Sequence, residues 1–337
     1  MSPQPESRVR EYCQRDTAQH DTAQHDKYTN DGDGCFHRTA AVSISAAKVL
    51  LFCDMCKSWY KKITQTFAYM QKFLYLCTRK RRKRREILGY MNFRTFGNIQ
   101  APTLLLIPGL GVSYELFLPL IRLTEDKFRI IAAEVDGFTL GTHTRFTSVD
   151  DQAAQVIDYI KVHYNGHLDG AYGLSLGGKI LSRIIERNEL IIDHAVLDAA
   201  PLLPLPNWLI NPLRYYQAAN VWTCYHWTGF WKFVFHSHYF DVLLDECRKI
   251  WPWGGKQAVL DGYKSVYTSK LERIYGNDIH FWYGTKEAFA AKPQVKHLLT
   301  ICPSAHVQIF KGMNHGQLLI DHPDEVAKRI NDLMAKQ

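Results

Sequence analysis

The most informative segment of the sequence is the pentapeptide Gly173-Leu174-Ser175-Leu176-Gly177. It lies between a short apolar stretch at 171–172 and a segment at 179–187 with the composition of a helix. A strand, a sharp turn and a helix together present a serine hydroxyl at the carboxyl end of a sheet. Glycines on both sides leave room for a backbone that larger side chains would obstruct. The turn also places the Leu176 N–H at a helix N-terminus, where negative charge is favoured.

Such a pentapeptide also occurs by chance, so the segments around it have to support the interpretation. A capping-box-like start at Ser148 and Asp151 opens one predicted helix, and apolar residues at helical spacing mark the last one, at 324–334. Alternating strands and helices predict an α/β fold with a mostly parallel, doubly wound sheet. Ligands bind such sheets at the carboxyl ends of the strands. The predicted strands are 91–96, 103–107, 129–133, 171–172, 194–197, 279–283 and 306–310.

The alternation stops at about 199–270, a segment that holds six of the eight tryptophans. The segment shows no strand pattern, and four prolines interrupt its start. We expect a mainly helical insertion that lies over the crevice as a lid. Most of its aromatic side chains are expected to pack the insertion against the core, and any that face the crevice favour a substrate with an apolar part.

The net charge of +8 is local, because 79–85 is a run of seven consecutive basic residues and the remainder carries 8 − 7 = +1. A nearly neutral main domain is not expected to bind nucleic acid. The basic run follows an apolar-aromatic stretch at 63–77, so 63–85 could make a weak contact with an anionic membrane surface. It could equally be a nuclear targeting signal or a solvated charged stretch.

Residues 1–90 are expected to form a separate N-terminal extension that is largely disordered or partly helical. A direct repeat of Asp-Thr-Ala-Gln-His at 16–25 is a polar low-complexity tract. The apolar stretch at 40–53 is too short for a membrane span, which takes about 20 residues, and it lies too far along the chain for a standard signal peptide. Cys53 and Cys56 have metal-pair spacing but no second pair, so no zinc site is expected. The scattered cysteines indicate a reducing, cytoplasmic location.

Four features occur in the order found in one large family. They are an apolar strand that ends in Pro108-Gly109-Leu110-Gly111, the turn at Ser175, a Gly-x-x-acid segment at 284–287 and a Gly-x-x-His segment at 312–315. On these motifs, residues 91–337 resemble the α/β-hydrolase superfamily, and within it the lidded branch that uses a serine nucleophile.

The resemblance implies a serine hydrolase that cleaves a carboxylic ester or related acyl bond through an acyl-enzyme. Ser175 would be the nucleophile, His315 the base and Glu287 the acid that orients the histidine. The backbone N–H groups of Leu110 and Leu176 would form the oxyanion hole. The implied chemistry needs no metal and no organic cofactor, and its substrate is a small acyl compound.

Alternatives stay open at each role. His306 and His322 are rivals for the base, and Asp198, which ends a predicted strand near the turn, is the second candidate for the acid. Asp278 precedes its strand, so it is expected at the wrong end of the sheet. A non-catalytic binding protein or an acyltransferase could use the same fold.

Overall fold

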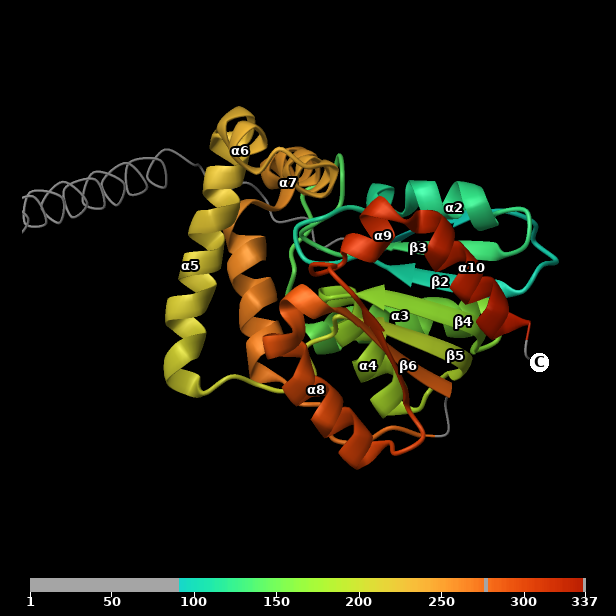
Figure 1. Ribbon diagram of the computed structural model, residues 1–337. Coiled ribbons are helices and arrows are strands. Elements are labelled where there is room, and N and C mark those ends of the chain that lie inside the picture. Colours follow the sequence, from blue (N-terminus) through green and yellow to red (C-terminus); the bar gives the residue numbers. More distant parts are fainter. Residues whose placement is uncertain (1–90, 276–277, 336–337) are drawn as a thin grey trace, which may run out of the picture. The chain divides into compact units, whose positions relative to one another are not determined.

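The computed structural model describes residues 91–275 and 278–335 (Figure 1). The predictions made for 1–90, including the basic run and the Cys53–Cys56 pair, lie outside the described residues. The described chain forms a seven-stranded sheet with the strand order β1-β3-β2-β4-β5-β6-β7. β1 runs antiparallel to β3, and all other neighbours are parallel, so the predicted mostly parallel sheet is confirmed.

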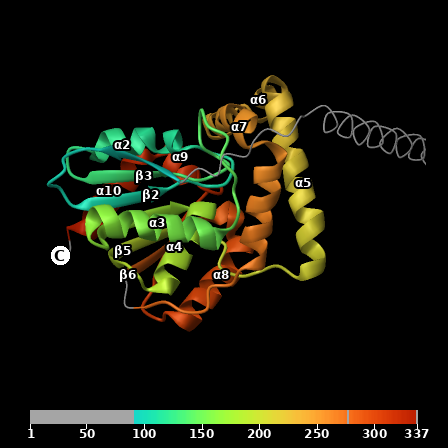
Figure 2. The same ribbon diagram turned by 180° about the vertical axis from the view of Figure 1, so that it is seen from behind.

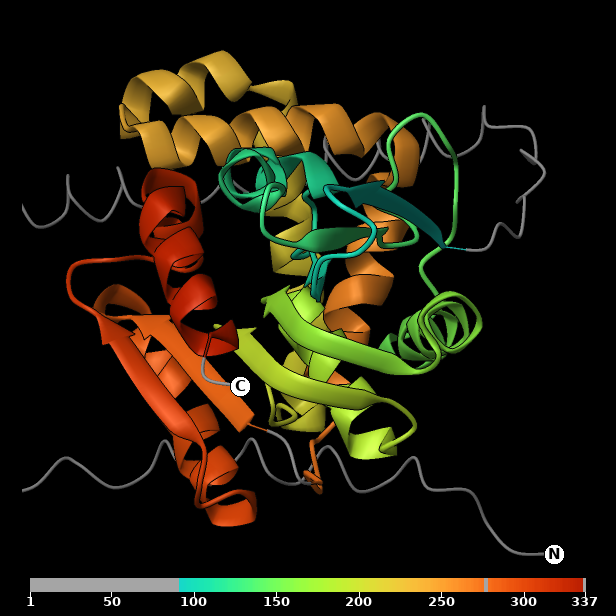
Figure 3. The ribbon, with the colours of Figure 1, turned by 90° about the vertical axis from the view of Figure 1, so that its right-hand side faces the viewer.

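The strands are β1 (Asn92–Phe96), β2 (Thr103–Ile107), β3 (Arg129–Glu134), β4 (His167–Leu174), β5 (Ile191–Asp198), β6 (Asp278–Gly284) and β7 (His306–Phe310). Figure 3 shows the strands fanned by the twist of the sheet, with β1 and β7 at opposite edges. The central strand β4 is much longer than the two residues predicted for it. It pairs with β2 over 170–173 and with β5 from 167 to 174, and the pairing with β5 extends it through glycine and polar residues that carry no strand signal.

Helices cover both faces of the sheet, as expected for a doubly wound fold (Figures 1 and 2). α3 (Val149–Tyr164), α4 (Leu176–Arg187) and α8 (Ala288–Ile301) contribute to the core on one face. The 3-10 helix η1 (Tyr114–Phe117) and the helices α2 (Leu118–Thr124), α9 (Gln317–Asp321) and α10 (Pro323–Met334) contribute to the core on the other. The predicted start of α3 is confirmed, because the Ser148 side chain accepts a hydrogen bond from the Asp151 N–H.

Strand β2 shows why its sequence is a continuous apolar run. Leu105 and Ile107 belong to the core beneath α3 and α4, whereas Leu104 and Leu106 belong to the core beneath α2 and α10. Successive side chains of a strand point to opposite faces, and here both faces are covered. Four consecutive apolar residues are therefore buried.

Three helices form an insertion between β5 and β6, namely α5 (Asn207–His226), α6 (Thr228–Phe235) and α7 (His238–Thr268). The predicted helical character of 199–270 is confirmed, whereas its action as a lid stays a prediction. α7 is interrupted at Gly255, where φ is +61°. Figure 1 shows the arrowheads of the parallel strands pointing toward α7 and α5. Among the described residues, no helix combines the length and the apolar character needed to cross a bilayer.

Candidate active site

The turn at Ser175 joins β4 to α4 in a backbone conformation that only a crowded environment enforces. Ser175 has φ +54° and ψ −110°, outside the regions that L-residues usually occupy. A Cβ on Gly177 would lie 2.0 Å from the Ile107 carbonyl oxygen, and one on Gly173 would lie 2.5 Å from the Gly177 carbonyl oxygen. Only glycine fits either position, as the sequence predicted. The Ser175 N–H donates to the Asp198 carbonyl oxygen over 2.7 Å, which fixes the turn to β5.

His315 and Glu287 form a direct pair. His315 lies in the loop between β7 and α9, and its Nδ1 is 2.6 Å from the Glu287 Oε2. The second carboxylate oxygen of Glu287 accepts a hydrogen bond from the Gly284 N–H over 3.1 Å. A Cβ on Gly284 would lie 2.2 Å from the Met313 carbonyl oxygen, so the two loops touch at their backbones. Both carboxylate oxygens of Glu287 are thus hydrogen-bonded, which fixes the position of its side chain.

The His315 loop packs directly against the serine turn. A Cβ on Gly316 would lie 2.9 Å from Leu174 Cδ1, so the residue after His315 contacts the residue before Ser175. Ser175 and His315 are therefore on loops that touch. No hydrogen bond joins their side chains in the described part of the chain. Catalytic hydrogen bonds are often long in a free enzyme and shorten once substrate is bound. The structure therefore brings His315 and Glu287 into contact and places Ser175 beside them.

The insertion supplies a further group that the sequence did not indicate. The hydroxyl of Tyr239, in the first turn of α7, donates to the His315 carbonyl oxygen over 2.7 Å. Tyr239 is buried, and its burial together with the negative charges of Glu287, Asp321 and Asp198 raises the pKa of its hydroxyl, so it stays a donor. The only sequence signal for this role was the general concentration of aromatic residues in the insertion.

The acids around His315 favour its charged form. Burial by itself lowers the pKa of His315, but the hydrogen bond and charge of Glu287, with the charge of Asp198, outweigh it and raise that pKa. The His315 side chain is 48% exposed, so solvent weakens each of these influences. A base with a raised pKa accepts a proton more readily, although a larger fraction is already protonated at neutral pH.

Asp198 also lies near the histidine, at the carboxyl end of β5, but its hydrogen bond goes elsewhere. Its Oδ2 accepts from the Tyr172 hydroxyl. Burial raises the pKa of Asp198 to about 7, against the lowering influence of the Tyr172 hydrogen bond and the charge of His315. Among the described residues, the carboxylate hydrogen-bonded to His315 is that of Glu287.

The other candidates for the base and the acid lie away from the serine turn. Asp278 begins β6 and His306 begins β7, so both lie at the amino edge of the parallel strands, opposite Ser175. Asp278 accepts from His280 over 2.9 Å and lies 3.6 Å from the His306 Nε2. His322 lies between α9 and α10, where its carbonyl oxygen accepts the Glu325 and Val326 N–H groups.

Two groups at this amino edge have the chemistry of metal ligands. Their donor atoms lie within 4.8 Å of one another, and they comprise Asp278, His280 and His306 in one group and His167, Asp169 and Asp193 in the other. Histidine nitrogens and carboxylate oxygens could hold a divalent cation. The same atoms also pair with each other, as His167 does with Asp193 over 2.8 Å, so the pairing explains them without an ion.

The expected oxyanion donors flank the serine. Leu176 is the first residue of α4, and N–H groups of a first helical turn have no acceptor within the helix. A Cβ on Gly109 would lie 3.6 Å from Ser175 Cβ, so the loop after β2 that carries Leu110 lies against the turn. The Leu110 side chain packs on α7, where a Cβ on Gly262 would lie 2.7 Å from its Cδ1.

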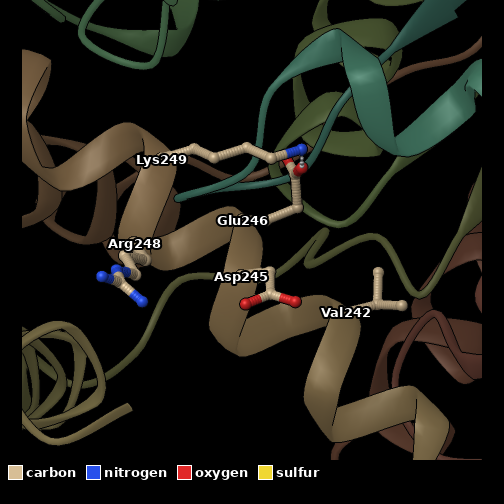
Figure 4. Close-up of a pocket in the computed structure, with 5 residues that line it drawn as sticks. All are labelled: Val242, Asp245, Glu246, Arg248 and Lys249. Atoms are coloured by element: carbon tan, nitrogen blue, oxygen red, sulfur yellow. Dashed lines mark hydrogen bonds and ion pairs between the residues drawn. The ribbon is translucent and has the colours of Figure 1, made fainter. Parts of the chain in front are cut away.

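A hollow of about 470 Å³ lies on α7 (Figure 4). It is lined by Val242, Asp245, Glu246, Arg248 and Lys249, and none of these belongs to the serine, histidine or acid loops. Glu246 is buried and accepts from the Ser113 hydroxyl over 2.7 Å and from Lys249 over 2.8 Å. This charged hollow has the wrong character for an apolar acyl group, and its glutamate instead ties α7 to the loop after β2.

Known proteins share this fold. The profile described as "Alpha/beta hydrolase family" matches residues 104–329. A family protein from Desulfitobacterium hafniense is 16% identical with a TM-score of 0.61, over 72% of this chain and all (100%) of that one. A thermophilic esterase from Thermogutta terrifontis is 15% identical with a TM-score of 0.58, over 73% of this chain and 93% of that one. An enol-lactonase from Burkholderia xenovorans LB400 is also 15% identical with a TM-score of 0.58, over 73% of this chain and 96% of that one. None of the curated proteins compared with the chain matches it.

Proposed function

The chain belongs to the alpha/beta hydrolase family, and we propose that it is a serine hydrolase of carboxylic esters or related acyl bonds. The observation that supports this most directly is the 2.6 Å contact between His315 and Glu287, on a loop that packs against the Ser175 turn. A serine hydroxyl is a weak nucleophile at neutral pH and needs an adjacent, oriented base. The three side chains come from three loops at one edge of the sheet, in the order expected from the resemblance.

In the proposed reaction, Ser175 Oγ attacks the substrate carbonyl carbon while His315 Nε2 takes the hydroxyl proton. The carbonyl oxygen becomes an oxyanion that the Leu110 and Leu176 N–H groups stabilise, each by about 3 kcal/mol. The intermediate collapses, the bond to the leaving oxygen breaks, and His315 returns the proton to the alcohol. Water then attacks the acyl-enzyme with His315 again as base, and a carboxylic acid leaves.

Glu287 has two roles in this scheme. It fixes the tautomer in which Nδ1 carries the proton, so that Nε2 is free to act as base, and it stabilises the imidazolium formed in each step. Its own position is fixed by the Gly284 N–H. The aromatic-rich insertion next to this loop favours a small acyl substrate with an apolar part.

Labelling with a fluorophosphonate probe tests the proposal. The intact chain should label, and Ser175→Ala and His315→Ala should not. Two matched controls, Ser304→Ala in an exposed loop and His322→Ala at the start of α10, should label like the intact chain. A folded intact chain that does not label would argue for a binding protein. Labelling without release of acid from an ester, but with transfer to an added alcohol, would identify an acyltransferase.

A further inference from the structure

Helix α6 and the residue before it expose a group of large apolar side chains. We define the α6 patch as Trp227, Phe230, Phe233, Val234 and Phe235, all of which are exposed. Phe233 is 81% exposed, Phe230 57% and Trp227 55%. Single exposed apolar side chains are ordinary, but five within nine residues of one helical segment are a contiguous patch of the kind that marks an interaction site.

The patch is not a consequence of loose packing. α6 is fixed to its neighbours, because Thr228 Oγ1 donates to the Cys224 carbonyl oxygen over 2.6 Å and Lys232 pairs with Asp245 over 2.8 Å. The half-buried Trp231 ring stacks on Phe235 with centroids 5.5 Å apart, and Phe235 in turn stacks on Phe240 of α7 with centroids 4.2 Å apart. Phe235 is therefore the attached end of the patch, and Phe233 is its most exposed member.

The charge of the surrounding segment indicates which kind of partner the α6 patch binds. Residues 199–240 contain no aspartate or glutamate, and their charged residues are Arg214 and Lys232. Twelve of the residues from 207 to 240 are phenylalanine, tyrosine or tryptophan. The adjacent helix α7 brings Asp245 against Lys232, but the insertion at 199–270 as a whole carries seven lysines and arginines against four acids, a net charge of 7 − 4 = +3. Aromatic rings concentrate at the headgroup level of membranes, and a surface of net positive charge is attracted to anionic lipid.

We propose that the α6 patch docks the protein on the surface of an anionic lipid bilayer, with the rings of Trp227, Phe230 and Phe233 in the boundary between headgroups and acyl chains. The eight residues of α6 span about 12 Å, far less than a bilayer, so the contact is interfacial. A protein partner fits less well, because stable protein interfaces take about 20–30 residues on each side and the patch offers five.

The patch lies close to the candidate active site along the chain. α6 ends at Phe235, and four residues later the Tyr239 hydroxyl donates to the His315 carbonyl oxygen. Docking would therefore place the histidine loop near the lipid. Access of bilayer acyl esters to Ser175 rests on the proposed function, whereas docking itself does not.

Flotation with vesicles tests docking on the full chain. The vesicles are phosphatidylcholine alone and phosphatidylcholine with phosphatidylglycerol at roughly 7:3. The intact chain should float with the anionic vesicles, and Phe233→Glu should weaken that partition by about tenfold or more, because it removes an inserted ring and adds a negative charge. Phe233→Ser should give an intermediate loss. The matched control is Val162→Glu on α3, also exposed (75%), which should stay within about twofold of the intact chain.

All four proteins keep the basic run at 79–85, so its contribution cancels in the comparison. Equal partition of Phe233→Glu and the intact chain, or no flotation of the intact chain, would overturn the proposal. So would light scattering that finds a dimer which Phe233→Glu dissociates, because the patch would then join two copies. Fluorophosphonate labelling without lipid should be the same in Phe233→Glu, so a failure of docking is distinguishable from a failure of the serine hydrolase proposal.

Discussion

Replacing Glu287 by glutamine should separate the two candidate acids. Glu287 makes a 2.6 Å charge-assisted hydrogen bond to His315 Nδ1, and such bonds contribute about 1.5–3 kcal/mol. At about 1.4 kcal/mol per tenfold, losing the bond alone reduces the rate by about 10- to 150-fold. A glutamine amide can also donate to Nδ1, which leaves the proton on Nε2 and removes the base. Loss of the correct tautomer brings the expected reduction in kcat to about 10³–10⁴-fold.

Asp198→Asn is the matched control, because it removes a charge near His315 without removing a hydrogen bond to it. The Asp198 carboxylate accepts from Tyr172, and the asparagine carbonyl can still accept that bond. Its influence on the histidine is through charge alone. We expect kcat to fall by less than about tenfold, the scale of one modest electrostatic contribution.

The assay is kcat/KM for a short-chain ester across a pH range of about 5.5 to 9. His315 acts as a base only when it is unprotonated, so activity rises with pH through its pKa. Glu287 and Asp198 both raise that pKa, so removing either charge should move the acidic limb to lower pH. Glu287→Gln should also lower the plateau by about 10³–10⁴-fold, whereas Asp198→Asn should lower it by less than about tenfold. A plateau for Asp198→Asn as low as that of Glu287→Gln, or a Glu287→Gln plateau within about tenfold of the intact protein, would refute the assignment.

Two further predictions concern side chains outside the triad. Tyr239→Phe removes the 2.7 Å hydrogen bond to the His315 carbonyl and should lower kcat by about tenfold with little change in KM; steady-state kinetics with an unchanged kcat would contradict this. Burial, and then the charge of Arg183, lowers the pKa of Lys179 to about 7. The unfolded chain therefore binds more protons between about pH 7 and 10.4, and stability from this group rises with pH across that window. Between pH 7 and pH 9, the free energy of unfolding of the intact protein should rise by about 2 kcal/mol more than that of Lys179→Met, as measured by urea unfolding. The same rise in both proteins would contradict the lowered pKa of Lys179.

Local patterns predicted best the strands that end at clear turn residues. The bounds of β2 and β7 agree with the prediction, because turn residues end both segments. The helices α2 and α8 were missed. Pro293 lies inside α8 and weakens its helical pattern, whereas α2 has only seven residues, too few for a clear helical period. Pairing with β5, which no local pattern encodes, extends β4 at both ends.

In the candidate site, too, local motifs predicted some residues, whereas residues placed by long-range contacts were missed. Motifs at the ends of strands were sufficient to name Ser175, Glu287 and His315, because parallel strands bring their carboxyl ends to one edge. The contribution of α7 could not be predicted. Tyr239 and Glu246 reach loops that are 76 and 133 residues away in the sequence, and neither occurs in a motif.

These contacts of α7 determine which part of the insertion can move. The buried Glu246 carboxylate accepts from the Ser113 hydroxyl and N–H, and a Cβ on Gly254 would lie 1.8 Å from the Gly137 carbonyl oxygen. Moving α7 outward would break both of these charge-assisted hydrogen bonds, each of which contributes about 1.5–3 kcal/mol. The side-chain hydrogen bonds described for α6 run to α5 and α7 only. We therefore expect α7 to stay in place beside the candidate site, and any opening of the predicted lid to involve α5 and α6.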